Sequence, residues 1–331
     1  MPTNQRVCII CQQNPEGLTA YLVDGNTVCQ DCISENYWLC HDCGEFHSMT
    51  IPVCPVIAHR HHRILSYSTK VTDVYATWRD HCGTQDSGQP LFGIELEMLP
   101  VKGGRERVAR TILESMDGLA IIKNDSSTAT RDADTNGFEL VTIPATLERA
   151  REIFDDCFFR PKLPQELGLR AWDAPKYGAS CGMHIHVSRE PLGLLQLGRI
   201  LVFIHEPNNL EFIKTLAGRG NTRWSEFTTE RKWRDALKYR DRYTAVNTTN
   251  QQTVEFRLFR ATLNRVHFMA NLEFVAALVE FCKPGVTGLS EGRKYTTFLS
   301  WLTTQRKTYP NLVYFLASKG YTKVMQKRKT A

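Results

Sequence analysis

Paired carboxylates mark the first stretch of this sequence that could do chemistry. In residues 92–98, Glu95 and Glu97 share one face of a predicted strand and apolar residues share the other, because side chains alternate between the two faces of a strand. Glu is depleted in strands and neighbouring like charges repel, so a bound cation would stabilise this face. Mg²⁺ accepts carboxylate oxygens and bridges substrate phosphates. The alternative is an ordinary amphipathic edge strand.

Three further segments alternate apolar and polar side chains in the same way. The polar positions are His184 and His186 in residues 181–188, Glu255 and Arg257 in residues 253–260, and Glu139 in residues 137–142. Taken singly, a His-x-His pair is more often a hydrogen-bonded pair, and a Glu-x-Arg strand is often a surface ion pair. Together they predict one antiparallel sheet with helices on its apolar face and a cavity on its polar face. Such a set suits a polynuclear Mg²⁺ or Mn²⁺ site that holds nucleotide phosphates, with Arg257 placed for phosphoryl transfer.

Cysteines crowd the start of the chain, where seven of the eleven lie within the first 54 residues. Disulfides do not persist in a cytosol, and two Cys-x-x-Cys pairs complete a tetrahedral zinc site. Sequential pairing predicts a first zinc site of Cys8, Cys11, Cys29 and Cys32. It predicts a second site of Cys40, Cys43, Cys54 and a histidine, for which we take His59, with His47, His61 and His62 as alternatives. Cross-braced pairing stays open. Zinc would stabilise this small ribbon-like or knuckle-like module.

Length and composition predict a soluble protein with an appended module, and the predicted sheet and helices make its core an α+β fold. The chain has 331 residues and a formal charge of +6, lacks a long apolar run and does not begin with a secretory signal, so we expect a cytoplasmic protein with no membrane partner. The arginines of residues 219–242 are too dispersed to indicate nucleic-acid binding. We predict a zinc module over residues 1–63, a linker over 64–90, a core over 91–285 and a helical extension with a basic tail over 286–331.

Several helices are expected around the predicted sheet. Periodicity and turn residues predict helices over residues 104–116, 146–156, 192–216 with a break near 207–209, 264–282 and 295–316. A strand at residues 120–123 leads into a turn that carries Asp125.

The order of these segments resembles the carboxylate-amine ligase superfamily, whose best-known member is glutamine synthetase. The G-M-H-x-H-x-S strand at residues 182–188, the E-x-R strand at 255–257 and the E-x-E strand at 95–97 carry the likeness. The chain is still more similar to the amidoligase family, which is common in bacteriophages and often begins with zinc-binding cysteine pairs. The segments that match are residues 93–97, 125–126, 137–141, 182–188, 242–247 and 253–257, so the resemblance spans about residues 1–280.

The resemblance implies an ATP-dependent ligase, in the cytoplasm of the host if phage-encoded, that activates a carboxylate as an acyl phosphate, which an amine then attacks. Carried over by position, the metal ligands are Glu95, Glu97, Glu139, Glu255 and His184, with His184 also near the phosphates. The residues implied near the nucleotide, phosphates or substrate are His186, Ser188, Arg219, Arg242 and Arg257, and Asp125 fits a D-x-S element. The sequence departs from the family at two places. Glu139 is the single acidic residue of the third metal-binding segment, in which glutamine synthetase has more acidic residues. Cys54 with histidines replaces the last Cys-x-x-Cys pair of the family's zinc module.

Two other classes of function stay open at this point. The same fold can transfer phosphate to another acceptor, as a kinase, or it can be an inactive scaffold whose zinc module binds protein or nucleic acid. For the ligase, we expect an amino acid, a peptide or a protein as the carboxylate substrate. The zinc module would be a scaffold or would recruit a protein partner, and a homo-oligomer is possible because glutamine synthetase builds its sites between subunits.

Overall fold

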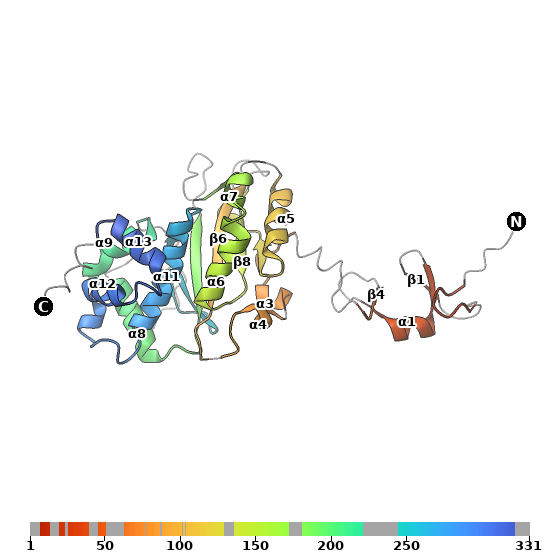
Figure 1. Cartoon of the computed structure of the whole chain (residues 1–331), viewed down its shortest axis with the longest axis horizontal. Helices are drawn as coiled ribbons and strands as arrows, with labels where there is room; N and C mark the ends of the chain where they lie inside the picture. Colours follow the sequence, from red (N-terminus) through yellow and green to blue (C-terminus); the bar gives the residue numbers. More distant parts are fainter. Residues whose placement is uncertain are drawn as a thin grey trace. The chain divides into compact units, whose positions relative to one another are not determined.

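The chain divides into two compact units, Met1–Arg63 and Ile64–Ala331 (Figure 1). The computed structural model describes residues 7–13, 20–23, 26–39, 46–50, 63–75, 77–86, 88–100, 102, 104–128, 136–171, 181–220 and 244–321. Within these ranges, none of the helices has the length and apolar content needed to span a bilayer.

The N-terminal unit is a small arrangement of two hairpins and a helix. Strands β1 (Ala20–Val23) and β2 (Asn26–Cys29) pair antiparallel, helix α1 (Gln30–Asn36) follows, and β3 (Tyr37–Leu39) pairs with β4 (Phe46–Ser48). Its buried apolar core holds little beyond Val23, Val28, Ile33 and cysteines. A core of this size is too small to stabilise a fold without a further cross-link such as a metal ion.

The larger unit is built on a mostly antiparallel sheet, so the predicted α+β class is confirmed. Its strand order is β11-β12-β10-β6-β8-β7-β5, and β9 pairs with the end of β6. The strands are β5 (Ile64–Leu65), β6 (Phe92–Pro100), β7 (Ala120–Lys123), β8 (Phe138–Thr142), β9 (Leu169–Arg170), β10 (Gly182–Ser188), β11 (Val246–Asn247) and β12 (Thr253–Arg260). All pairings are antiparallel except that of β5 with β7.

The segment predicted as a linker contributes to this sheet. Strand β5 pairs with β7, and the short helices α3 (Val71–Val74) and α4 (Trp78–His81) follow it. A strand of two residues has no readable alternation, which is why the sequence did not reveal it. Residues 64–90 are therefore part of the larger unit rather than a free connector.

Helices cover the apolar face of the sheet. They are α5 (Arg105–Met116), α6 (Leu147–Phe154), α7 (Leu163–Glu166), α8 (Leu194–His205), α9 (Leu210–Ala217), α11 (Arg265–Phe281), α12 (Tyr295–Thr304) and α13 (Pro310–Ser318). Helix α11 is buried along most of its length, and α8, α9, α12 and α13 gather around it (Figure 1). Its Phe274 lies 6.3 Å from the ring of Phe259 on β12, and its Asn271 contacts Met183 on β10. An apolar helix enclosed in this way belongs to the core of a domain.

Candidate functional site

The register of the sheet lines up polar side chains from six strands on one face. The opposed positions are Lys123 and Glu139 on β7 and β8, Glu139 and Glu97 on β8 and β6, Glu95 and His184 on β6 and β10, His186 and Glu255 on β10 and β12, and Glu255 and Asn247 on β12 and β11. Opposed positions in a sheet share a face, so these side chains converge.

A β-bulge lies in the middle of this face. Between two regular stretches of pairing, His184 on β10 is opposite two residues of β12, Arg257 and Leu258. Successive carbonyls of a regular strand point to opposite edges, yet Arg219 donates both to Leu258 O, at 3.0 Å, and to Arg257 O. The bulge has therefore turned two neighbouring carbonyls the same way, and Arg257 stays on the polar face in an ion pair with Glu255.

Carboxylates and imidazoles meet in three overlapping groups, each with ligand atoms within 4.8 Å of one another. The groups are Glu95, His186 and Glu255; Glu95, Glu139 and His184; and Glu97, Glu139 and Asp125. Because Glu95 and Glu139 each belong to two groups, the three form a continuous row across the sheet. Carboxylate oxygens suit Mg²⁺ or Mn²⁺ and imidazoles suit transition metals, so this donor set could hold a divalent ion.

Both histidines lie between carboxylates. The Nδ1 atom of His184 lies 3.2 Å from Glu95 Oε2 and 3.6 Å from Glu255 Oε1, and its Nε2 lies 4.0 Å from Glu97 Oε1. The Nε2 atom of His186 lies 3.3 Å from Glu95 Oε1, but without hydrogen-bond geometry, and it is buried. These ring nitrogens are thus directed into the row of carboxylates.

Burial and neighbouring charge shift the pKa values of this cluster in opposite directions. Burial raises the pKa of Glu139 well above its usual range, and the charge of Glu95 adds to this. Burial also raises the pKa of Glu97, although His184 and the N–H of Gly182 oppose it. At Glu95, burial is outweighed by the two histidines, which hold its pKa well below its usual range. The row therefore contains more buried carboxylate than its neighbours can stabilise in ionised form.

Two residues of this face were not found from the sequence. Lys123 is buried, and its Nζ lies 3.1 Å from Glu139 Oε2 and 5.5 Å from the ring centre of Tyr67. Asn247 donates from Nδ2 to Glu255 Oε2 at 2.8 Å. The only sequence signal for Lys123 was its position at the end of the apolar strand at residues 120–123. Asn247 belongs to the segment 242–247 that resembles the amidoligase family, but nothing in the sequence indicated its contact with Glu255. Both side chains orient a carboxylate of the row.

The remaining predicted residues have different positions. Asp125 follows β7 and joins the group with Glu97 and Glu139. The hydroxyl of Ser188 accepts from the N–H of Leu91 at 2.9 Å. Arg219 supports β12 through backbone carbonyls, and burial lowers its pKa to about 10. Arg242 lies outside the described residues, so its predicted contact stays a prediction, as do the ligand contacts of Ser188 and Arg219.

Two cavities open beside this polar face. They measure about 660 and 460 Å³, and both are lined by Gly93, His186 and Thr253. Glu95 and Lys123 line the smaller one. Residues that line only the larger one include Ser188, Trp78 and Arg79. Cavities of this size hold small organic ligands, so a ligand lying in them would reach the carboxylate row with one end.

The N-terminal unit has a second possible metal site, made of Cys8, Cys11, Cys29 and Cys32 with sulfurs within 4.8 Å of one another. Cys29 ends β2 and Cys32 lies in the first turn of α1. The second Cys-x-x-Cys pair therefore spans the junction between this strand and the helix. Sulfurs bound at 2.3 Å around a tetrahedral zinc lie about 3.8 Å apart. The Cys11 and Cys29 sulfurs are 3.8 Å apart. The predicted first site can therefore bind zinc.

The thiols of this cluster differ in their pKa values. Backbone N–H groups at Cys11 and Cys29 lower the pKa of Cys8 to about 6, whereas burial and the neighbouring thiols raise that of Cys32 to about 12. A dication would remove this conflict by holding all four as thiolates. The ligands predicted for the second site, Cys40, Cys43, Cys54 and His59, lie outside the described residues. His47, an alternative ligand, lies on β4 with its ring 5.3 Å from that of Trp38.

The polar sheet face thus combines carboxylates, imidazoles and an arginine, and it adjoins cavities large enough for a ligand. A phosphate-bearing ligand would need cations to approach so acidic a surface. No protein-family model matches the chain, and no curated protein matches its sequence significantly.

Proposed function

We propose that the chain is an ATP- and Mg²⁺-dependent carboxylate-amine ligase of the amidoligase kind, which forms an amide or isopeptide bond on an amino acid, a peptide or a protein. The observation that carries the proposal is the row of three linked carboxylate and histidine groups on one sheet face, next to Arg257. Sites of phosphoryl transfer combine carboxylates that hold divalent ions with an arginine that neutralises the transferred charge.

The side chains of the row have distinct tasks in this proposal. Glu95, Glu97, Glu139 and Glu255, with His184, would hold Mg²⁺ or Mn²⁺, which would neutralise the charge of the ATP phosphates. His186 lines both adjoining cavities and would contact the phosphate end of the nucleotide. Lys123 and Asn247 would keep Glu139 and Glu255 oriented when the ions exchange.

The proposed reaction has two steps. A carboxylate oxygen of the substrate attacks the γ-phosphorus of ATP, the bond to the β-phosphate oxygen breaks, and ADP leaves with that electron pair. The amine then attacks the acyl carbon, inorganic phosphate leaves, and the amine nitrogen loses a proton. Arg257 would stabilise the transferring phosphoryl group, and its pairing with Glu255 and the bulge keeps it on the polar face.

Calorimetry of ATP binding, with and without Mg²⁺, tests the nucleotide site. Wild type is expected to bind ATP in a Mg²⁺-dependent manner and Glu97→Ala to lose this binding. Glu291→Ala is the control, because that glutamate is exposed and pairs with Lys294 outside the sheet. Absence of metal-dependent ATP binding by the zinc-loaded wild type would contradict the proposal.

Product analysis tests the reaction itself. Pools of carboxylates and amines are offered with ATP, and release of ADP and phosphate is measured. A ligase requires both co-substrates, so ADP release that needs no amine would indicate a kinase instead. Removal of residues 1–63 with retained ligation of a small substrate would support a recruiting role for the zinc module.

A further inference from the structure

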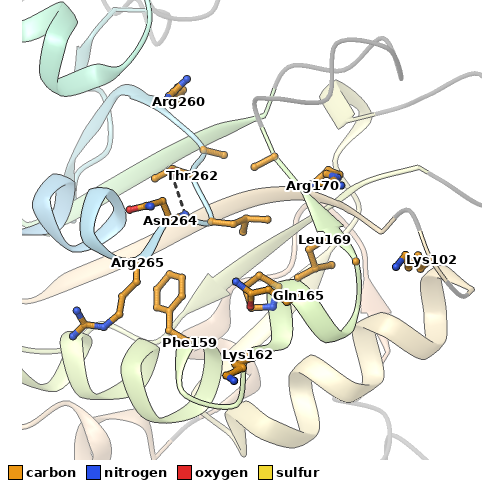
Figure 2. Close-up of a pocket in the computed structure, with 15 residues that line it drawn as sticks. Lys102, Phe159, Lys162, Gln165, Leu169, Arg170, Arg260, Thr262, Asn264 and Arg265 are labelled. Atoms are coloured by element: carbon orange, nitrogen blue, oxygen red, sulfur yellow. Dashed lines mark hydrogen bonds between the residues drawn. The ribbon is translucent and has the colours of Figure 1, made fainter.

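A cavity of about 930 Å³ lies at the end of the sheet and takes no part in the proposed ligase chemistry (Figure 2). Four segments surround it: the stretch just after β6, the turn into α7, strand β9 and the connection from β12 to α11. Lys102 lies five residues after Glu97 of β6, and Arg260 lies five residues after Glu255 of β12. Five residues of extended chain span roughly 15 Å. The cavity is therefore separate from the carboxylate row.

The charge of this lining is of one sign. Among its described residues are five cations and no carboxylate: Lys102, Lys162, Arg170, Arg260 and Arg265. Arg265 is neutralised, because its Nε and Nη2 atoms lie 2.5 and 2.6 Å from the carboxylate of Asp155. The other four form no ion pair with any residue that the structure describes. One of them, Arg260, also has a buried Nε atom that forms no hydrogen bond with any described residue.

Apolar groups lie between these cations. Phe159, Leu169 and Leu263 line the cavity, and Figure 2 shows Phe159 and Leu169 inside the ring of charged residues that the view labels. The segment before α11 also lines it, so the start of that seventeen-residue helix, where the helix dipole is positive, lies beside the cavity. The ligand that fits best has an apolar body and more than one negative charge.

Backbone conformation and packing locate two of the exposed cations at the edge of the cavity. Lys162 has a φ of 55°, a left-handed conformation that is unusual for a residue other than glycine, and it precedes α7. The side chain of Lys102 lies against Gly168, where an added Cβ would come within 2.8 Å of the lysine Cδ. The stem of Lys102 therefore packs against Gly168 at the edge of the cavity, while the residue as a whole stays exposed to solvent.

We propose that this cavity binds a small organic dianion, with phosphate or paired carboxylates on an apolar body, at a site independent of the carboxylate row. The test is calorimetry on the full, zinc-loaded chain in buffer without Mg²⁺. Phenyl phosphate and phthalate are the dianionic probes, and benzyl alcohol is the neutral control. Binding of only phenyl phosphate would assign a phosphate ligand, binding of only phthalate would assign a dicarboxylate, and either result supports the proposal.

The variant that tests the site is Lys162→Asn combined with Arg170→Gln. Asparagine tolerates the left-handed backbone, so the first change removes charge without new strain. The double variant is expected to bind the dianions at least about tenfold more weakly, since each charge-assisted contact contributes about 1 kcal/mol or more. Lys283 is a half-exposed lysine that pairs with Glu280 outside the cavity, and Lys283→Gln is expected to bind the dianions within about twofold of wild type.

Three results would overturn the proposal. They are no dianion binding by wild type, equal binding of benzyl alcohol, and unchanged dianion binding by the double variant. An unchanged thermal unfolding midpoint for the double variant ensures that a loss of binding is not a loss of fold. Because the assay contains neither ATP nor Mg²⁺, its outcome does not depend on the proposed ligase activity.

Discussion

Replacing Glu97 by glutamine is expected to stabilise the metal-free protein. Glu97 is buried on the polar sheet face opposite Glu139, and burial raises its pKa. The fold therefore disfavours its ionised form. Glutamine has nearly the same shape and retains an oxygen that can accept the hydrogen bond from Gly182 N, now 2.7 Å long. The change thus removes charge while leaving the contact in place.

The expected gain follows from the distances in the row. Ligand atoms of Glu97 and Glu139 lie within 4.8 Å of each other, and two unit charges at that distance repel by roughly 3.5 kcal/mol at an effective dielectric constant of about 20. Lys123 beside Glu139, and partial protonation of the pair, reduce this repulsion. We expect a net increase of about 1–3 kcal/mol in the free energy of unfolding, which corresponds to a rise of roughly 2–10 °C in Tm.

The pH dependence has a defined sign. A carboxyl whose folded pKa is raised above its unfolded value of about 4.5 contributes its full stability below that value and loses it as the pH rises through the folded pKa. Wild type loses this contribution on going to neutral pH, whereas the glutamine variant has no such group to ionise. The stability difference should therefore be larger near pH 8 than near pH 5.

Urea unfolding of both proteins at these two pH values, without divalent ions, measures the difference. Glu291→Gln, at an exposed site, is expected to change stability by less than about 0.5 kcal/mol. Added Mg²⁺ should stabilise wild type more than the variant, because binding to the folded state adds to stability. A variant no more stable than wild type at pH 8, or a difference independent of pH, would refute the conclusion that burial and neighbouring charge disfavour the ionised form of Glu97.

Three further predictions concern other parts of the chain. Arg257→Ala should lower kcat of the proposed ligase by about 10³-fold with little change in KM for ATP, and steady-state kinetics showing equal changes in both would contradict its role. Glu273→Ala should lower the free energy of unfolding by about 3–5 kcal/mol, because the fully buried carboxylate lies 2.8 Å from Arg151 Nη2; a loss below about 1 kcal/mol in urea unfolding would disprove this. Cys32→Ser should reduce bound zinc by about one equivalent per chain in elemental analysis, and unchanged zinc content would exclude the four-cysteine site.

Local patterns made the longer strands and helices of the larger unit predictable. Alternation located β6, β10 and β12 and separated their polar from their apolar faces, and apolar periodicity located α5 and α11 to within a residue or so of their observed ends. These patterns arise from the geometry of a single element, so one sequence is enough to reveal them. The convergence of the acidic and histidine side chains was inferred correctly from the shared alternation.

Features that depend on contacts between distant segments were not predictable. The bulge opposite His184 requires knowledge of how β10 and β12 pair, and the ion pair of Lys123 with Glu139 requires the pairing of β7 with β8. The basic cavity draws Lys102, Lys162 and Arg260 from segments far apart in the chain, so no local motif contains them. Only the folded register brings such residues together.

The contacts of Arg219 with β12 also satisfy two backbone carbonyls next to the short strand β11. Strand β11 is two residues long and pairs with Glu255 and Phe256, and the N–H of Arg257 donates to Ala245 O just before it. Exposed strand edges with free carbonyls can accept a strand from another molecule and start aggregation. Here one guanidinium occupies the carbonyls of Arg257 and Leu258. A single side chain thus satisfies two neighbouring carbonyls of β12 beside a strand of only two residues.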